Sequence, residues 1–215
     1  MSGSVRDWLR VYLIMGEMES KGKRTEEVLE AALEGGVTCF QFREKKMPIP
    51  EQLALGRRLR ALCRKRGVPF LVNDRVDVAM LLEADGVHLG QDDVPCLEAR
   101  RLLGPGKVIG VSAGNWDEVR SALAQKPDYL SVGPVYATST KPDAGAPIGT
   151  MLIRELKAST DVPIVGIGGI HAANAAAVMI AGADGVAVVS AIADQPDPAQ
   201  AARLLVQAVR RYAKN

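Results

Sequence analysis

The stretch "VPIVGIGGIHAANAAAVMIAGADGVAVVSAI", residues 162–192, contains two apolar runs on either side of one helix-like segment. Residues 162–169 and 185–192 are rich in Val and Ile, as buried strands are, and residues 172–181 between them are rich in Ala. A strand, a helix and a second strand in this order predict two parallel strands joined by a helical crossover. The fold therefore depends on how often this unit recurs.

The same unit recurs along the whole chain. Further strands are expected at residues 11–15, 37–43, 68–74, 86–90, 107–113 and 128–135. Helices are expected at residues 25–36, 50–66, from 76, 95–103, 116–125, 150–157 and 198–212. Eight strand–helix units predict one (β/α)8 TIM-barrel domain over residues 1–215, with residues 1–9 as a short N-terminal extension. An open doubly wound sheet is disfavoured because no GxGxxG motif follows the first strand.

The composition excludes several classes of protein. Hydrophobic residues make up 47% of the chain, aromatic residues 4%, and the net charge is only +2, which gives no general reason to bind nucleic acid or membranes. No apolar run approaches the roughly 20 residues of a membrane-spanning helix, and the first residues lack the apolar core of a signal peptide. Cys39, Cys63 and Cys96 show no CxxC spacing, so we expect reduced, packed thiols and a cytoplasmic location.

The segment "TCFQFREKKMP", residues 38–48, separates into two faces when it is interpreted with the period of a strand. Phe40 and Phe42 lie on one face, which we expect to pack against helices. Gln41, Arg43 and, past the end of the strand, Lys45 lie on the other. An amide, a guanidinium and an ammonium in a row at the end of a buried strand predict a site for an anionic ligand.

Polar residues follow most of the other predicted strands as well. In a TIM barrel the carboxyl ends of the strands meet at one rim, where the site lies. The residues expected there are Asn73, Asp74, His88, Gln91, Asp92, Asp93, Ser112, Tyr136, Thr138, Thr140, Lys141, Gly168, Gly169 and Ser190. The small residues of "GIGGI" and "VVSAI", after the seventh and eighth strands, predict a phosphate site.

The carboxylates and the histidine of this rim allow more than one interpretation. Asp74 and the Asp92/Asp93 pair could form plain ion pairs with the nearby cations, hold Mg²⁺ together with substrate phosphate oxygens, or serve as acid and base in a sugar-type reaction. The residues alone do not choose between Asp92 and Asp93. His88 either makes only structural hydrogen bonds or takes part in the chemistry.

Seven motifs in order, "QFREK", "VND", "GVHLGQDD", "GVSAGN", "GPVYATSTK", "VPIVGIGGI" and "GADGVAVVSAI", resemble the thiamine phosphate synthase family. The resemblance covers residues 11–192, and its QxRxK and TxTK elements are the more specific ones. It implies a transferase of thiamine biosynthesis that joins hydroxymethylpyrimidine diphosphate to thiazole phosphate. Pyrophosphate would leave first, in a dissociative mechanism through a pyrimidinylmethyl cation.

The resemblance also implies a role for each matching residue. Gln41 would contact the aminopyrimidine, with Ser112 near it, and Asp74 and Asp93 would carry Mg²⁺. The diphosphate would be held by Arg43, Lys45, Asn73 and Lys141, and of these residues Arg43, Lys45 and Lys141, with Ser112, would act in catalysis. The thiazole phosphate would be held by Thr138, Thr140, Gly169, Val189 and Ser190.

One position departs from the family's pattern. Gly114 stands where many relatives carry a His that the tautomerase branch of this fold uses, which counts against a thiazole tautomerase-like isomerase. That isomerase and a non-catalytic barrel that binds phosphate ligands are the alternatives to the synthase. The sequence leaves the oligomeric state open, and a homo-oligomer is compatible with it.

Overall fold

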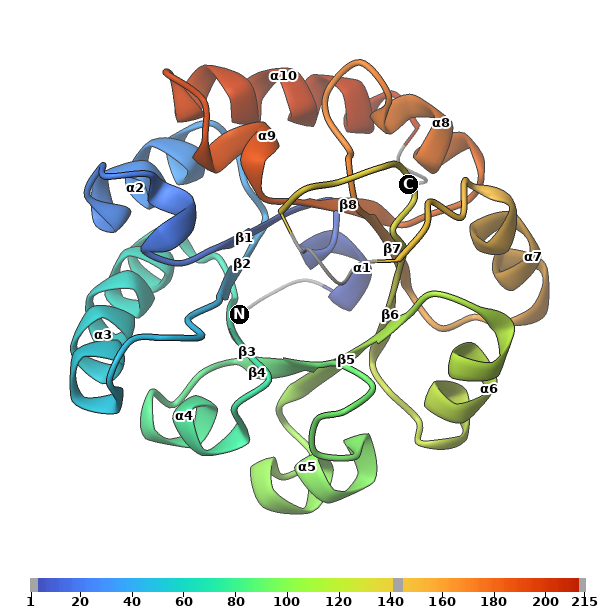
Figure 1. Ribbon diagram of the computed structural model, residues 1–215, viewed down its shortest axis with the longest axis horizontal. Helices are drawn as coiled ribbons and strands as arrows, with labels where there is room; N and C mark the ends of the chain where they lie inside the picture. The colour runs from blue at the N-terminus through green and yellow to red at the C-terminus, as the bar shows by residue number, and fades with distance from the viewer. Residues whose placement is uncertain (1–3, 141–144, 213–215) are drawn as a thin grey trace.

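The computed structural model describes residues 4–140 and 145–212. Its eight strands are all parallel and form a closed barrel in which each strand lies beside its neighbours in sequence (Figure 1). The (β/α)8 prediction is therefore confirmed. The strands are β1 Val11–Met15, β2 Cys39–Phe42, β3 Phe70–Asn73, β4 Gly86–Leu89, β5 Val108–Ala113, β6 Tyr129–Val132, β7 Ile164–Ile167 and β8 Gly185–Val188.

The helices form a ring outside the barrel (Figure 1). They are α2 Thr25–Glu34, α3 Ile49–Arg66, α4 Val76–Leu81, α5 Cys96–Leu103, α6 Trp116–Ala124, α7 Met151–Ser159, α8 Ala175–Ile180, α9 Ser190–Ala193 and α10 Pro198–Arg210. The structure also has a 3-10 turn η1 at Met18–Ser20 and, apart from the ring, a short helix α1 at Val5–Trp8. In the part of the chain that the structure describes, no helix combines the length and the hydropathy needed to span a bilayer.

The alternation of side chains along the strands produces two cores. Phe40 and Phe42 point outward and pack among the helices, as the two-residue period predicts. Cys39 and Gln41, from the same strand, are buried on the opposite side, which faces the barrel interior. The apolar part of the interior core contains Leu9, Tyr12, Ile14, Cys39, Leu71, Val108, Tyr129, Val165 and Ala187. All three cysteines are buried and free, as expected from their spacing.

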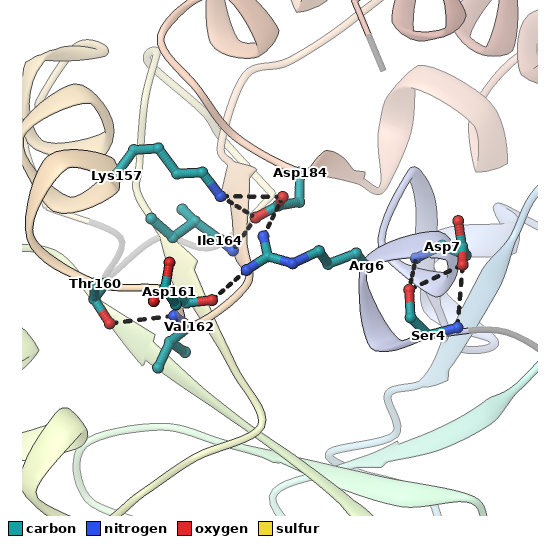
Figure 2. Close-up of polar contacts among 9 residues, drawn as sticks. All are labelled: Ser4, Arg6, Asp7, Lys157, Thr160, Asp161, Val162, Ile164 and Asp184. Atoms are coloured by element: carbon teal, nitrogen blue, oxygen red, sulfur yellow. Dashed lines mark hydrogen bonds and ion pairs between the residues drawn. The ribbon is translucent and has the colours of Figure 1, made fainter. Parts of the chain in front are cut away.

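Helix α1 closes the amino-terminal end of the barrel. Val5 and Trp8 pack against the interior core, to which Leu9 belongs, and α1 lies within the ring of strands in Figure 1. Figure 2 shows how it is attached: Arg6 bonds the Asp184 carboxylate and the carbonyl of Asp161. The predicted N-terminal extension thus includes a short helix that seals the barrel floor.

A repeated hydrogen-bond pattern fixes the strands in pairs at this same end. The residue just before each even-numbered strand accepts, through its side chain, a backbone N–H from the first or, in β5, the second residue of the preceding strand. Its own N–H donates back to that residue's carbonyl. The four pairs are Thr38 with Val11, Asp85 with Phe70, Asp128 with Ile109, and Asp184 with Ile164. Each pair gives a hydrogen-bond acceptor to a backbone N–H near the strand start that would otherwise be buried without one, so it helps to set the register.

Some predicted boundaries were wrong at strand ends. The predicted strand at residues 185–192 ends at Val188, and the helix α9 begins at Ser190, because Ala and Ser in "SAIA" favour a helical turn as well as a strand end. The predicted strand at residues 128–135 ends at Val132, before Gly133 and Pro134, and Pro lacks the N–H that a ladder requires.

Candidate active site

The site residues named from the sequence lie at the carboxyl ends of the strands, apart from Lys141, which falls outside the described residues. Gln41 and Ser112 belong to β2 and β5, Asn73 is the last residue of β3, and the rest follow strand ends. Those that follow strand ends are Arg43, Lys45, Asp74, Asp93, Thr138, Thr140, Gly169, Val189 and Ser190. One rim of the barrel therefore gathers the cations, the carboxylates and the hydroxyls.

Arg43 is anchored by a carboxylate that the sequence had not suggested. Its Nη1 lies 2.9 Å from Oε1 of Glu19, in a pair whose side chains are only 21% and 14% exposed. The other oxygen of Glu19 accepts the backbone N–H of Gly16 at 2.9 Å, at the end of β1. Glu19 thus connects the guanidinium to the barrel wall and limits the orientations of Arg43.

Lys45 and two carboxylates form the neighbouring corner of the rim. Lys45 Nζ lies 3.3 Å from Oδ2 of Asp74. Asp74 has a positive φ of 61°, a conformation that is uncommon for residues other than glycine, although Asp adopts it more readily than most. Burial raises the pKa of Asp93, and the adjacent Asp74 carboxyl raises it further, although the Gly90 N–H, 2.6 Å away, opposes the rise. The two carboxylates are therefore close, whereas Asp92 is exposed.

Gln41 and Ser112 are connected through the barrel interior. Gln41 donates to the hydroxyl of Tyr12, that hydroxyl meets the hydroxyl of Tyr129, and Tyr129 meets His88 Nδ1. His88 Nε2 lies 2.9 Å from the hydroxyl of Ser112. His88 therefore makes hydrogen bonds inside the barrel, which is compatible with both of its sequence interpretations. Gln91 also holds this strand end, by donating to the carbonyl of Ser112 at 2.5 Å.

The opposite side of the rim is built from glycines and hydroxyls. Gly168 and Gly169 have φ values of 96° and 63°, and a Cβ on Gly169 would lie 2.4 Å from the carbonyl oxygen of Ala137. Only glycine fits both the backbone angle and the close approach. The turn after β7 therefore lies directly against the segment after β6, where the Thr138 hydroxyl accepts the N–H of Thr140 at 3.3 Å.

A hollow lies at the other end of the barrel. Its volume is about 420 Å³, and its lining includes Arg6, Arg10, Lys157 and Asp184. Arg6 and Lys157 both already pair with Asp184, so these two cations are partly neutralised (Figure 2). The carboxyl-end rim, with its denser set of polar groups, is the better candidate for chemistry.

Sequence reasoning did not identify Glu19, Tyr12 or Tyr129. Glu19 is in a turn rather than at a strand end, so its carboxylate had no pattern to mark it. Tyr12 and Tyr129 were signalled more clearly, because each places a phenol hydroxyl in a strand that the sequence predicts to be buried, and a buried Tyr hydroxyl needs a partner.

A closed barrel whose carboxyl rim gathers cations, carboxylates and a glycine turn is typical of TIM-barrel enzymes. The thiamine monophosphate synthase family model matches residues 11–192 of this chain. The chain belongs to that family, and it is a transferase of the thiamine-phosphate synthase type.

Individual proteins agree with the family assignment. The thiamine-phosphate synthase of Moorella thermoacetica is 49% identical over 201 residues, which cover 94% of this chain and 96% of that protein. The thiamine-phosphate synthase of Chloroflexus aurantiacus is 51% identical over 199 residues, covering 93% and 91%. Among solved structures, thiamine phosphate pyrophosphorylase from Pyrococcus furiosus matches with a TM-score of 0.89 and 36% identity over 98% of this chain and all of that one.

Proposed function

We propose that the chain joins hydroxymethylpyrimidine diphosphate to thiazole phosphate, with release of pyrophosphate, in thiamine biosynthesis. The observation that carries this proposal is the corner of the rim where Arg43 and Lys45 lie beside the carboxylates of Asp74 and Asp93. Cations and a carboxylate pair together suit a diphosphate that arrives with a divalent metal ion. The names of the relatives support the same reaction.

The proposed chemistry is dissociative. The bond between the pyrimidine methylene carbon and the diphosphate oxygen breaks first, and its electron pair leaves with pyrophosphate. The ring amino group stabilises the resulting cation, and the thiazole nitrogen then forms the new C–N bond. The protein needs no nucleophile of its own, but it must stabilise the departing anion and align the two substrates.

The leaving diphosphate is assigned to the cationic corner. Arg43 offers a planar fork that the Glu19 carboxylate holds in place, which suits contacts to two phosphate oxygens. Lys45 offers a point charge beside it. Asn73 at the end of β3 and Lys141, which lies outside the described residues, complete the proposed set. The catalytic role falls to Arg43, Lys45, Lys141 and Ser112.

The pyrimidine is assigned to Gln41 and Ser112. Because the amide nitrogen of Gln41 donates to Tyr12 at 2.6 Å, its carbonyl oxygen is the group available to accept the ring amino N–H. The hydroxyl of Ser112 is held by His88 within the same mouth. The thiazole phosphate is assigned to the glycine side of the rim, with ligands Thr138, Thr140, Gly169, Val189 and Ser190.

Asp74 and Asp93 fit a Mg²⁺ ion. In residues 4–140 and 145–212, no three His, Cys, Asp or Glu side chains gather closely enough to hold a metal unaided. Burial and, after it, the neighbouring Asp74 carboxyl raise the pKa of Asp93, and two adjacent carboxylates are what Mg²⁺ uses when substrate phosphates supply further ligands. Bound Mg²⁺ would neutralise charge on the diphosphate oxygens as the leaving group departs.

The test is to measure pyrophosphate release and coupled product with each substrate alone and with both. The proposal requires both substrates for product formation. Conversion of thiazole phosphate alone, without pyrophosphate, would indicate the isomerase, and binding without turnover would indicate the non-catalytic barrel. A cytoplasmic location, a homo-oligomeric state and the absence of nucleic-acid or membrane partners stay predictions.

A further inference from the structure

A continuous chain of hydrogen bonds crosses the barrel interior. It runs from Gln41 through Tyr12, Tyr129 and His88 to Ser112, with donor–acceptor distances of 2.6, 2.9, 2.8 and 2.9 Å in that order. The five residues come from five different strands. Tyr12 and Tyr129 are both 0% exposed, so neither can touch a substrate. They can act only through the residues at the two ends.

The barrel interior leaves room for this chain of hydrogen bonds. A Cβ on Gly110 would lie 2.0 Å from Cζ of Tyr129 and 2.4 Å from its hydroxyl oxygen, so the missing side chain at Gly110 is what lets the phenol cross the interior. The ring of His88 stacks on that of Tyr129 at a centroid distance of 5.5 Å. Burial raises the pKa of both tyrosines well above the usual value, so each stays a neutral phenol with one proton to donate.

Gln41 sets which group donates in each of these hydrogen bonds. The amide nitrogen of Gln41 can only donate, so the Tyr12 oxygen accepts there and the Tyr12 proton is directed to Tyr129. Tyr129 then donates to His88 Nδ1. A neutral imidazole that accepts at Nδ1 carries its proton on Nε2 and donates it to the oxygen of Ser112. The proton of Ser112 is left to point away from the interior, toward the mouth.

The geometry points to Tyr129, supported by Tyr12, as a positioning residue that holds His88 as the Nε2–H tautomer and turns the Ser112 hydroxyl proton toward the substrate. This inference rests on the proposed function for its effect on turnover, but its structural part does not. If the Gln41 amide were reversed, every bond would run the other way, and Ser112 would donate inward to His88.

The tautomer can be measured without any substrate. The chain has only two histidines, so ¹⁵N-histidine labelling gives two sets of ring signals, and a His171→Gln variant assigns them. His171 is exposed and makes none of the hydrogen bonds of the interior network. We expect His88 of the ligand-free protein to carry its proton on Nε2. A proton on Nδ1 would overturn the inference, whether or not the protein proves to be a synthase.

Two matched variants separate positioning from mere packing. Tyr129→Phe and Tyr12→Phe each remove one buried hydroxyl and keep the ring, but only the hydroxyl of Tyr129 touches His88. Tyr129→Phe should leave Nδ1 without its donor, so that the Nδ1–H form becomes populated beside the Nε2–H form, and should lower kcat about tenfold, the effect of misdirecting one hydrogen bond. Tyr12→Phe removes the group that directs the Tyr129 proton, so it should change the tautomer less than Tyr129→Phe does, and it should raise KM for the pyrimidine diphosphate because Gln41 loses its anchor.

The kcat values and the His88 tautomers of the two variants together test the inference. Equal losses of kcat in the two variants, with the tautomer unchanged in both, would reduce the tyrosines to packing residues and overturn the inference. Melting temperatures of both variants would show whether each hydroxyl contributes the same stability. A protein without pyrophosphate release in any form would contradict the proposed function, while the tautomer measurement would still test the hydrogen-bond chain.

Discussion

Glu19→Gln tests whether the anchored Arg43 is what recognises the diphosphate. The change keeps the size of the side chain and an oxygen that can accept from Gly16, but it removes the charge 2.9 Å from the guanidinium. A hydrogen bond to a charged group contributes about 1.5 to 3 kcal/mol. The pair is 21% and 14% exposed, so we take the lower part of that range, and about 1.4 kcal/mol corresponds to a tenfold change in binding.

We therefore expect Glu19→Gln to raise KM for the pyrimidine diphosphate about tenfold, with a smaller change in kcat and none in KM for the thiazole phosphate. Steady-state kinetics with pyrophosphate detection measure all three quantities. Glu17→Gln is the matched control, since it makes the same chemical change at an exposed residue of the same turn. An unchanged KM would refute the anchoring argument, and a lowered KM would show that Glu19 competes with the substrate for Arg43.

Three further predictions concern the metal, the strand faces and the barrel floor. Asp74→Asn and Asp93→Asn should each lower kcat/KM on the order of 100-fold, and EDTA should abolish turnover until Mg²⁺ is restored. Full activity in buffer that contains EDTA would contradict the metal assignment. Arg43→Lys should lower kcat/KM at least about tenfold, because a point charge replaces the fork of the guanidinium, whereas Phe42→Leu should mainly lower stability. Kinetics and urea unfolding on both variants measure this, and a larger loss of activity in Phe42→Leu than in Arg43→Lys would show that the strand faces are misassigned. Asp85→Ala should lower the free energy of unfolding by about 1 to 3 kcal/mol and the melting temperature by roughly 2 to 12 °C, because the Phe70 N–H loses its acceptor. Asp85→Asn should retain most of the stability, and equal melting temperatures for the wild type and both variants would argue against the pairing pattern.

The fold was predictable because each strand and each helix has its own local pattern of apolar residues. The period of two places Phe42 outside and Gln41 inside, and the buried faces of the barrel enforce that period. Boundaries were less predictable where two local preferences compete, as at Ser190, which can end a strand or begin a helix. The rim residues could be named because parallel strands bring all their carboxyl ends to one side.

Long-range partners could not be predicted from local patterns. Glu19 meets Arg43 only because the η1 turn folds back over the end of β1, and nothing in the sequence near Glu19 encodes that contact. Tyr12 and Tyr129 are 117 residues apart, and their hydroxyls meet only once the barrel closes. The four side-chain pairs at the barrel floor have the same character, although their position just before every even-numbered strand is a regular feature that a sequence pattern could use.

The most direct test of the central claim is a crystal structure of the protein soaked with Mg²⁺, pyrophosphate and thiamine phosphate, the products of the proposed reaction. We predict pyrophosphate within hydrogen-bond distance of Arg43 and Lys45, a metal ion between Asp74 and Asp93, and the pyrimidine against Gln41. Pyrophosphate bound instead in the hollow lined by Arg6, Arg10 and Lys157, at the amino-terminal end of the barrel, would contradict the account.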